Sequence, residues 1–111
     1  MKFSSKTQAL ISQRCSNKCE LCGQIAVYHQ FHHRRPRGMG GSKNALTGSP
    51  CNALFLHPGC HALVESNREN ALDNGWLVRQ GINPSEVPVK LHTGWVLLLE
   101  DGSVSPVVKF D

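Results

Sequence analysis

The hydrophobic positions of the chain repeat with a helical period in two segments. The first is residues 5–14, where the starting tetrapeptide Ser-Lys-Thr-Gln has the form of a capping box. The residues predicted to face the core are Ala9, Leu10 and Ile11. The second segment runs from Cys60 to about Asn74, and Gly75 is a typical residue to end it. The pattern therefore predicts two helices, one near the N-terminus and one beyond the middle of the chain.

Runs of β-branched and aromatic residues predict the strands. Two such runs, at residues 25–33 and Ala53–Leu56, flank a segment rich in glycine and proline that is expected to be a loop over residues 34–47. Four more short runs follow the second helix, at residues 76–78, 87–91, 95–99 and 104–108. The dipeptide Asp101-Gly102 is typical of a hairpin turn between the last two runs. This order of elements predicts the α+β class.

The chain has 111 residues, of which 40% are hydrophobic, and this is enough for one small domain. Its longest apolar run has five residues, Trp95 to Leu99, whereas a membrane-spanning helix needs about 20. No apolar segment of a secretory signal follows Met1, so a cytoplasmic protein without a membrane partner is expected. The net charge is +4, and residues 1–43 hold eight Lys or Arg against one acidic residue. This uneven charge indicates either a polyanionic partner or a solvated basic surface.

Cysteine and histidine form two close pairs that are typical of a zinc site. The odd number of cysteines, five, without a secretory signal argues against a disulfide framework. Zinc takes four N or S ligands, commonly as two close pairs from separate turns. The predicted ligands of one structural Zn²⁺ ion are Cys19, Cys22, His57 and Cys60. Cys15 is an alternative ligand, Cys51 is expected to be a small hydrophobic residue, and the alternative to the whole site is a set of unconnected buried thiols.

Three histidines and one asparagine form a second group in the middle of the chain. His32 and His33 end a predicted strand, Asn52 precedes the next strand, and His61 opens the following helix. Because successive side chains on a strand point to opposite sides, one imidazole of the adjacent pair can bind a metal ion while the other faces a different part of the site. This order of elements can place His32 and His61 around one ion.

The spacing of this group closely resembles that of the HNH endonucleases, which carry the ββα-metal (His-Me finger) motif. The resemblance rests on His32, His33, Pro36, Gly40, Gly41, Asn52, Cys60 and His61. It covers roughly residues 15–75 and is closest to the small free-standing HNH proteins of bacteriophages. The zinc-bearing branch of the family has a cysteine where this chain has His57. Because zinc accepts a histidine nitrogen as readily as sulfur, this departure weakens the zinc prediction little.

The resemblance implies a role for each matched residue. His33 matches the general base that takes a proton from water, and Asn52 matches the asparagine that braces the loop by hydrogen bonds. His32 and His61 match ligands of the catalytic divalent ion, which would be Mg²⁺, Mn²⁺ or Ni²⁺. Some members add a ligand one helical turn later, at Glu65 in this chain. The alternatives for Glu65 are a hydrogen bond that orients His61 and a solvated helix residue.

Three arginines, Arg34, Arg35 and Arg37, follow directly after the candidate base. Guanidinium groups match phosphate oxygens, so these residues are predicted to bind nucleic acid. The alternative is a solvated basic loop.

Together these features predict one α+β domain over residues 1–111, with a ββα-metal core at about 15–75 and a zinc knuckle. A small antiparallel sheet at about 76–111 is expected to pack on the core through Trp76 and Trp95. The predicted function is metal-dependent nicking or cleavage of DNA with low sequence specificity. Because the resembling phage proteins often act beside the terminase, the resemblance implies DNA and a phage terminase as partners and the host cytoplasm as location.

Three alternatives compete with this interpretation. A zinc-knuckle module that binds nucleic acid without catalysis explains the charge and the zinc equally well, but it does not require the three histidines. A bacteriocin-type toxin nuclease is usually the end of a much longer chain. A restriction-type nuclease for modified DNA would need a separate reader domain.

Overall fold

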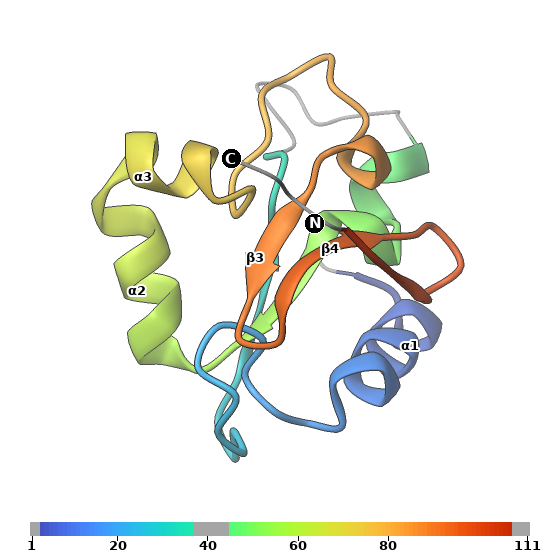
Figure 1. Cartoon of the computed structure of the whole chain (residues 1–111). Coiled ribbons are helices and arrows are strands. Elements are labelled where there is room, and N and C mark those ends of the chain that lie inside the picture. The colour runs from blue at the N-terminus through green and yellow to red at the C-terminus, as the bar shows by residue number, and fades with distance from the viewer. Residues whose placement is uncertain (1–2, 37–44, 108–111) are drawn as a thin grey trace.

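A pair of antiparallel strands lies at the centre of the fold, with helices on opposite sides and a second sheet across it (Figure 1). The structure, a computed structural model, describes residues 3–36 and 45–107. Its helices and strands are α1 (Ser5–Cys15), β1 (Gln30–His33), β2 (Ala53–Leu56), α2 (Pro58–Ser66), α3 (Arg68–Asp73), β3 (Val89–Leu91), β4 (Gly94–Leu98) and β5 (Val104–Pro106). The predicted α+β class is confirmed. Within the described ranges no helix is both long and apolar enough to cross a membrane.

The central pair, β1 and β2, joins Gln30 to Leu56 and His33 to Ala53 in antiparallel register. All four residues of β2 are fully buried, which explains why its continuous apolar run predicted the strand with the right bounds. The predicted strand over residues 25–33 is wrong in its first half, because β1 begins only at Gln30. There Ile25 forms a single isolated bridge with Lys18.

Helix α1 begins at Ser5, as predicted, and ends at Cys15, one residue later than predicted. Its N-cap is Ser4, whose hydroxyl accepts the backbone N–H of Thr7 at 3.1 Å, so the predicted cap at the next serine is wrong. Ile11 is fully buried as predicted, but Ala9 is exposed. The helix ends where Ser16 takes a left-handed conformation with φ of 55°.

The single helix predicted from Cys60 to Asn74 is two helices, α2 and α3. Asn67 has an extended conformation that interrupts the helix, and its side chain caps α3 by accepting the N–H of Asn70 at 3.0 Å. Gly75 ends α3 with φ of +75°, and a Cβ there would lie 2.1 Å from the carbonyl oxygen of Pro88. The predicted strand at residues 76–78 is not formed.

The C-terminal sheet has the order β3–β4–β5, with antiparallel neighbours. Each strand is shorter than its predicted run or shifted by one residue, and position 108 of the last run lies outside the described residues. The predicted turn is present, with Gly102 at φ of +92° between β4 and β5. Trp76 joins this sheet to the core as predicted, because its Nε1 donates to the carbonyl of Lys90 at 2.7 Å. Trp95 is half-buried in β4.

Candidate metal centres

The two predicted pairs of zinc ligands come together in the fold. One pair lies in the turn after α1 and the other at the start of α2. The ligand atoms of Cys19, Cys22, His57 and Cys60 all lie within 4.8 Å of one another. Two ligands of one zinc ion lie at most about 4.6 Å apart, because Zn–S bonds are about 2.3 Å long. The thiolate cluster, as we name these four residues, can therefore hold a structural metal such as zinc.

Backbone geometry holds the first pair of the thiolate cluster in place. Gly23 donates its N–H to the carbonyl of Cys19 at 2.8 Å and has φ of +79°. A Cβ on Gly23 would lie 2.7 Å from the ring nitrogen Nδ1 of His92, so only glycine fits this turn. Burial raises the pKa of Cys19, but backbone N–H groups, first that of Cys22, outweigh it and lower the pKa below its usual value. The turn therefore favours a thiolate, the form that binds zinc.

The second pair opens α2. His57 caps this helix through Nδ1, which accepts the N–H of Gly59 at 3.0 Å. Its other ring nitrogen, Nε2, lies 3.2 Å from the sulfur of Cys60 and is thus the atom that faces the cluster. Burial and the neighbouring Cys19 sulfur raise the pKa of Cys60 to about 12. A divalent ion would stabilise the Cys60 thiolate that this environment otherwise disfavours.

The remaining two cysteines lie outside this group. Cys15 is not among the residues of the thiolate cluster, and burial raises its pKa to about 11. It is a neutral thiol at physiological pH, which does not favour the alternative ligand role. Cys51 is fully buried in the hydrophobic core, as predicted.

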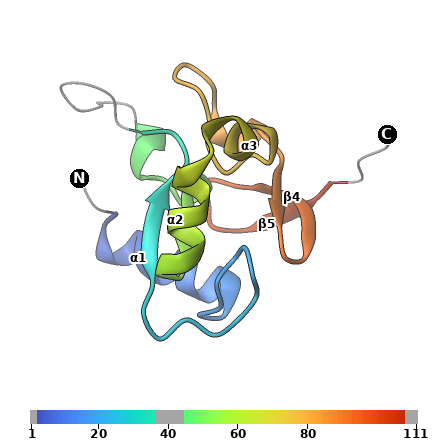
Figure 2. The same ribbon diagram turned by 90° about the vertical axis from the view of Figure 1, so that its left-hand side faces the viewer.

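A second cluster lies between β1 and α2, which run side by side (Figure 2). Ligand atoms of His32, His61 and Glu65 lie within 4.8 Å of one another. His32 is 5% exposed, whereas the Glu65 side chain is 65% exposed, so the cluster runs from the interior to the solvent. These residues line a pocket of about 380 Å³ together with His33 and Leu77. We call it the histidine pocket.

Each histidine of this cluster has a hydrogen-bond partner on the ring nitrogen that faces away from the other ligands. Nε2 of His32 donates to the carbonyl of Trp76 at 2.9 Å, which leaves Nδ1 with its lone pair. Burial lowers the pKa of His32 to about 4, so that lone pair stays free of a proton at neutral pH. Nδ1 of His61 contacts the side-chain oxygen of Gln30, and its Nε2 lies 3.1 Å from a carboxylate oxygen of Glu65.

The candidate base, His33, follows directly on β1. Its ring stacks on Phe3 with centroids 4.1 Å apart and planes inclined by 16°. It also lines the histidine pocket, so both adjacent histidines reach this site.

Asn52 is fully buried and does not reach the pocket surface. Its side-chain oxygen accepts the N–H of Arg35 at 2.7 Å, and its nitrogen donates to the carbonyls of Arg35 and Thr47 at 3.1 and 3.0 Å. Its own carbonyl accepts the N–H of Arg34. These bonds hold the backbone of the two residues that follow His33, as expected of a bracing residue.

The prediction that Arg34 and Arg35 contact nucleic acid is wrong, because both are buried. Arg34 is completely buried, and its guanidinium donates to four backbone carbonyls. They belong to Cys51, Gly75, Pro84 and Val87, at 2.8 to 3.1 Å. Arg35 is 4% exposed and donates to the carbonyl of Ile82 at 2.8 Å. Arg37, the third predicted contact, lies outside the described residues.

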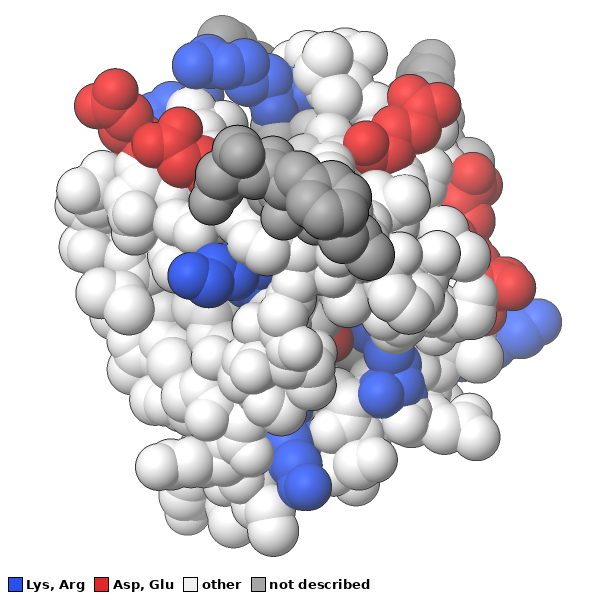
Figure 3. All heavy atoms as spheres, in the orientation of Figure 1, with Lys and Arg blue, Asp and Glu red and all other residues white. Residues whose placement is uncertain are grey.

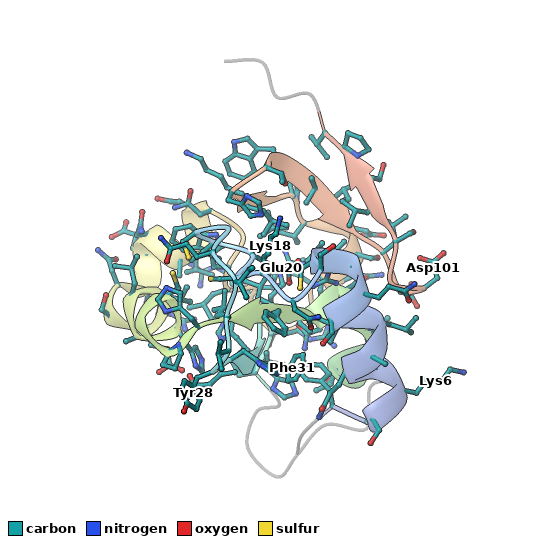
Figure 4. All side chains as sticks on the ribbon, turned by 90° about the horizontal axis from the view of Figure 1, so that it is seen from below. Lys6, Lys18, Glu20, Tyr28, Phe31 and Asp101 are labelled. Carbon is teal, nitrogen blue, oxygen red and sulfur yellow. The ribbon has the colours of Figure 1, made fainter. Side chains whose placement is uncertain are left out.

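The exposed basic residues that the structure describes include Lys6, Lys18 and Arg79. On the face shown in Figure 3, the Lys and Arg side chains do not gather into one patch. Lys6 points away from the body of the protein on α1, and Lys18 lies in the turn that follows this helix (Figure 4). Arg79 is exposed and lies two residues beyond Leu77, which lines the histidine pocket. Among the described residues, a phosphate contact by a Lys or Arg side chain would have to come from exposed residues such as these.

A buried ion pair near the thiolate cluster was not predicted. Glu20 lies in the turn between the two cysteines of the first pair, and its carboxylate accepts from Arg14 at 2.6 Å. The same oxygen accepts the N–H of Phe55 at 2.9 Å and so attaches this turn to β2. Arg14 lies in the last turn of α1 and Glu20 follows six positions later, beyond the end of the helix, so their spacing carries no signal of a pair.

Comparisons of the chain with protein-family models, with curated proteins and with solved structures find no match.

Proposed function

We propose that this protein is a metal-dependent endonuclease of the HNH type, which nicks or cleaves DNA by hydrolysing phosphodiester bonds with low sequence specificity. The observation that carries the proposal is the gathering of His32, His61 and Glu65 in a pocket that His33 also lines. These residues lie on β1 and α2, and the chain order of β1, β2 and α2 is two antiparallel strands followed by a helix. That order supports a ββα-metal core.

The donor set of the histidine pocket fits a divalent cation. Two imidazole nitrogens and one carboxylate oxygen suit Mn²⁺ and Ni²⁺, and the open part of the pocket leaves room for the water oxygens that Mg²⁺ retains. His32, His61 and Glu65 would hold the ion, which would supply positive charge to the scissile phosphate and the leaving oxygen. The buried, unprotonated Nδ1 of His32 supports this assignment because a lone pair kept free of protons is ready to coordinate.

His33 is the proposed general base that takes a proton from the attacking water. Stacking on Phe3 keeps its ring from turning away from the pocket. The hydrogen bonds of Asn52 hold the backbone directly after His33, so Asn52 is a positioning residue for the base. A correctly placed base contributes about 10²–10⁴-fold to the rate of such a reaction.

The thiolate cluster has a structural role in this proposal, with zinc as its ion. A zinc ion there would link the turn after α1 to the first turn of α2. Because His61 lies in that same turn of α2, the link would also fix one ligand of the histidine pocket. DNA is the proposed partner, and association with a phage terminase in the host cytoplasm belongs to the same proposal.

The test is to incubate zinc-loaded protein with supercoiled plasmid and Mg²⁺, Mn²⁺ or Ni²⁺, with a matched reaction in chelator. We expect nicked or linear DNA only with added ion, and a loss of cleavage in His61→Ala purified in parallel. Intact plasmid with every ion would refute the proposal. If such a protein still bound DNA, the zinc-knuckle binding module without catalysis would be the better account.

A further inference from the structure

We infer that Gln30 is a positioning residue for His61, whose Nε2 it keeps free for metal binding by accepting a hydrogen bond from Nδ1–H. The inference rests on the proposed function, because it takes the histidine pocket to be a divalent-ion site. Gln30 is the first residue of β1, and His61 lies in the first turn of α2. The strand and the helix run side by side (Figure 2). The side-chain oxygen of Gln30 lies 2.5 Å from Nδ1 of His61.

The partner of Nδ1 decides which nitrogen of His61 can bind an ion. A neutral imidazole carries one N–H and one lone pair. If the oxygen of Gln30 accepts from Nδ1–H, the lone pair is on Nε2, which lies 3.1 Å from Glu65 Oε1 inside the cluster. With no acceptor at Nδ1, the proton can move to Nε2 and be donated to the Glu65 carboxylate. That second tautomer places a proton where the ion would bind.

The position of Gln30 on β1 suits this role. Residues two apart on a strand share a face, so Gln30 and His32 point to the same side. His32 provides a ligand atom, and Gln30 supports the other imidazole. The carbonyl of Trp76 can only accept, so it fixes the tautomer of His32 without help from any side chain. The amide of Gln30 can either donate or accept a hydrogen bond. Replacement of its oxygen therefore tests whether Gln30 acts as the acceptor for His61 Nδ1–H.

Three variants of the zinc-loaded, full-length protein separate the possibilities. Gln30→Leu removes the acceptor, and Gln30→Glu keeps an acceptor that cannot donate when ionised. Gln13→Leu makes the same chemical change at an exposed position of α1 and is the matched control. Mn²⁺ binding is followed by electron paramagnetic resonance. We expect about 10–100-fold weaker binding in Gln30→Leu, since loss of a partner of a ligating histidine has this effect, and parental or tighter binding in Gln30→Glu.

A second measurement reports the tautomer directly. Nitrogen-15 shifts of the His61 imidazole, recorded without added Mn²⁺, should show the Nδ1–H form in the parent and in Gln30→Glu. Gln30→Leu should shift toward the Nε2–H form. Parental Mn²⁺ affinity and a parental tautomer in Gln30→Leu would overturn the role of Gln30 and leave the proposed function standing. A parent protein that binds no Mn²⁺ in the pocket would overturn both.

Discussion

Cys60 and His61 are consecutive residues at the start of α2, yet their side chains enter two different clusters. The sulfur of Cys60 faces His57 in the thiolate cluster, while the imidazole of His61 turns toward Glu65 in the histidine pocket. Successive residues of a helix differ by about 100° in direction, which is why neighbours in sequence can serve different sites. One helical turn therefore positions ligands for both candidate metals, and a disturbance of one cluster should reach the other.

The first prediction concerns the thiolate cluster. Cys60→Ser should lose the tightly held zinc, of which we expect about one per chain, because serine is a much weaker zinc ligand than a thiolate. We expect insoluble or unfolded protein, since a structural zinc contributes folding energy directly. Metal analysis and circular dichroism check this. Cys15→Ser, the matched control, should keep its zinc because Cys15 lies outside the cluster. A well-folded, zinc-free Cys60→Ser protein would contradict the prediction.

The second prediction concerns the base. His33→Ala should cleave plasmid about 10²–10⁴-fold more slowly than the parent while it binds Mn²⁺ with parental affinity. His29→Ala is the matched control, since His29 also stacks on a phenylalanine, Phe55, with centroids 4.3 Å apart but is not among the residues that line the histidine pocket. It should retain cleavage. Equal rates for His33→Ala and the parent would remove His33 from the mechanism.

The third prediction concerns the buried arginine. Arg34→Met should lower the free energy of unfolding by roughly 3 kcal/mol or more, since each buried carbonyl left without a donor costs about 1–3 kcal/mol. Urea unfolding measures the effect. Arg79→Met is an exposed control that should change stability by no more than about 0.5 kcal/mol. Parental stability of Arg34→Met together with weaker DNA binding would instead assign Arg34 to the DNA interface.

The fourth prediction concerns Glu65. If its carboxylate binds the ion, Glu65→Gln should weaken Mg²⁺ binding sharply and shift preference toward Mn²⁺ or Ni²⁺, because Mg²⁺ depends most on oxygen ligands. Titration with each ion separates this from a role in orienting His61, for which a loss of about 10–100-fold with unchanged preference is expected. Glu69→Gln on α3 is an exposed control. Parental titrations with every ion would leave Glu65 without a role.

Local patterns predicted the elements that depend on local interactions. The continuous apolar run of β2 predicted its bounds correctly because a fully buried strand needs no alternation. The four residues of the thiolate cluster were also found, since two close pairs of thiol and imidazole have few other uses. The break at Asn67 was missed because helical periodicity continues across it and only the capping preference of asparagine marks it.

Interactions between distant segments could not be predicted in this way. A sequence of three arginines in a loop is compatible with a solvated surface and with burial. Only the fold brings the carbonyls of Gly75, Pro84 and Val87 around Arg34. The contact of Gln30 with His61 was missed for the same reason, because 31 positions separate them and a lone glutamine at the start of a strand carries no signal.

The carbonyls around Arg34 also bear on how the chain can be divided. Three of the four belong to residues 75–87, and the acceptor that orients His32 is the carbonyl of Trp76. A fragment that stopped near residue 74 would keep all seven candidate metal ligands. It would leave the buried guanidinium of Arg34 without three of its acceptors and the imidazole of His32 without the carbonyl that orients it. The segment that carries both candidate metal centres therefore depends on residues beyond it. A graft of this segment onto another scaffold would have to include residues 75–87 as well.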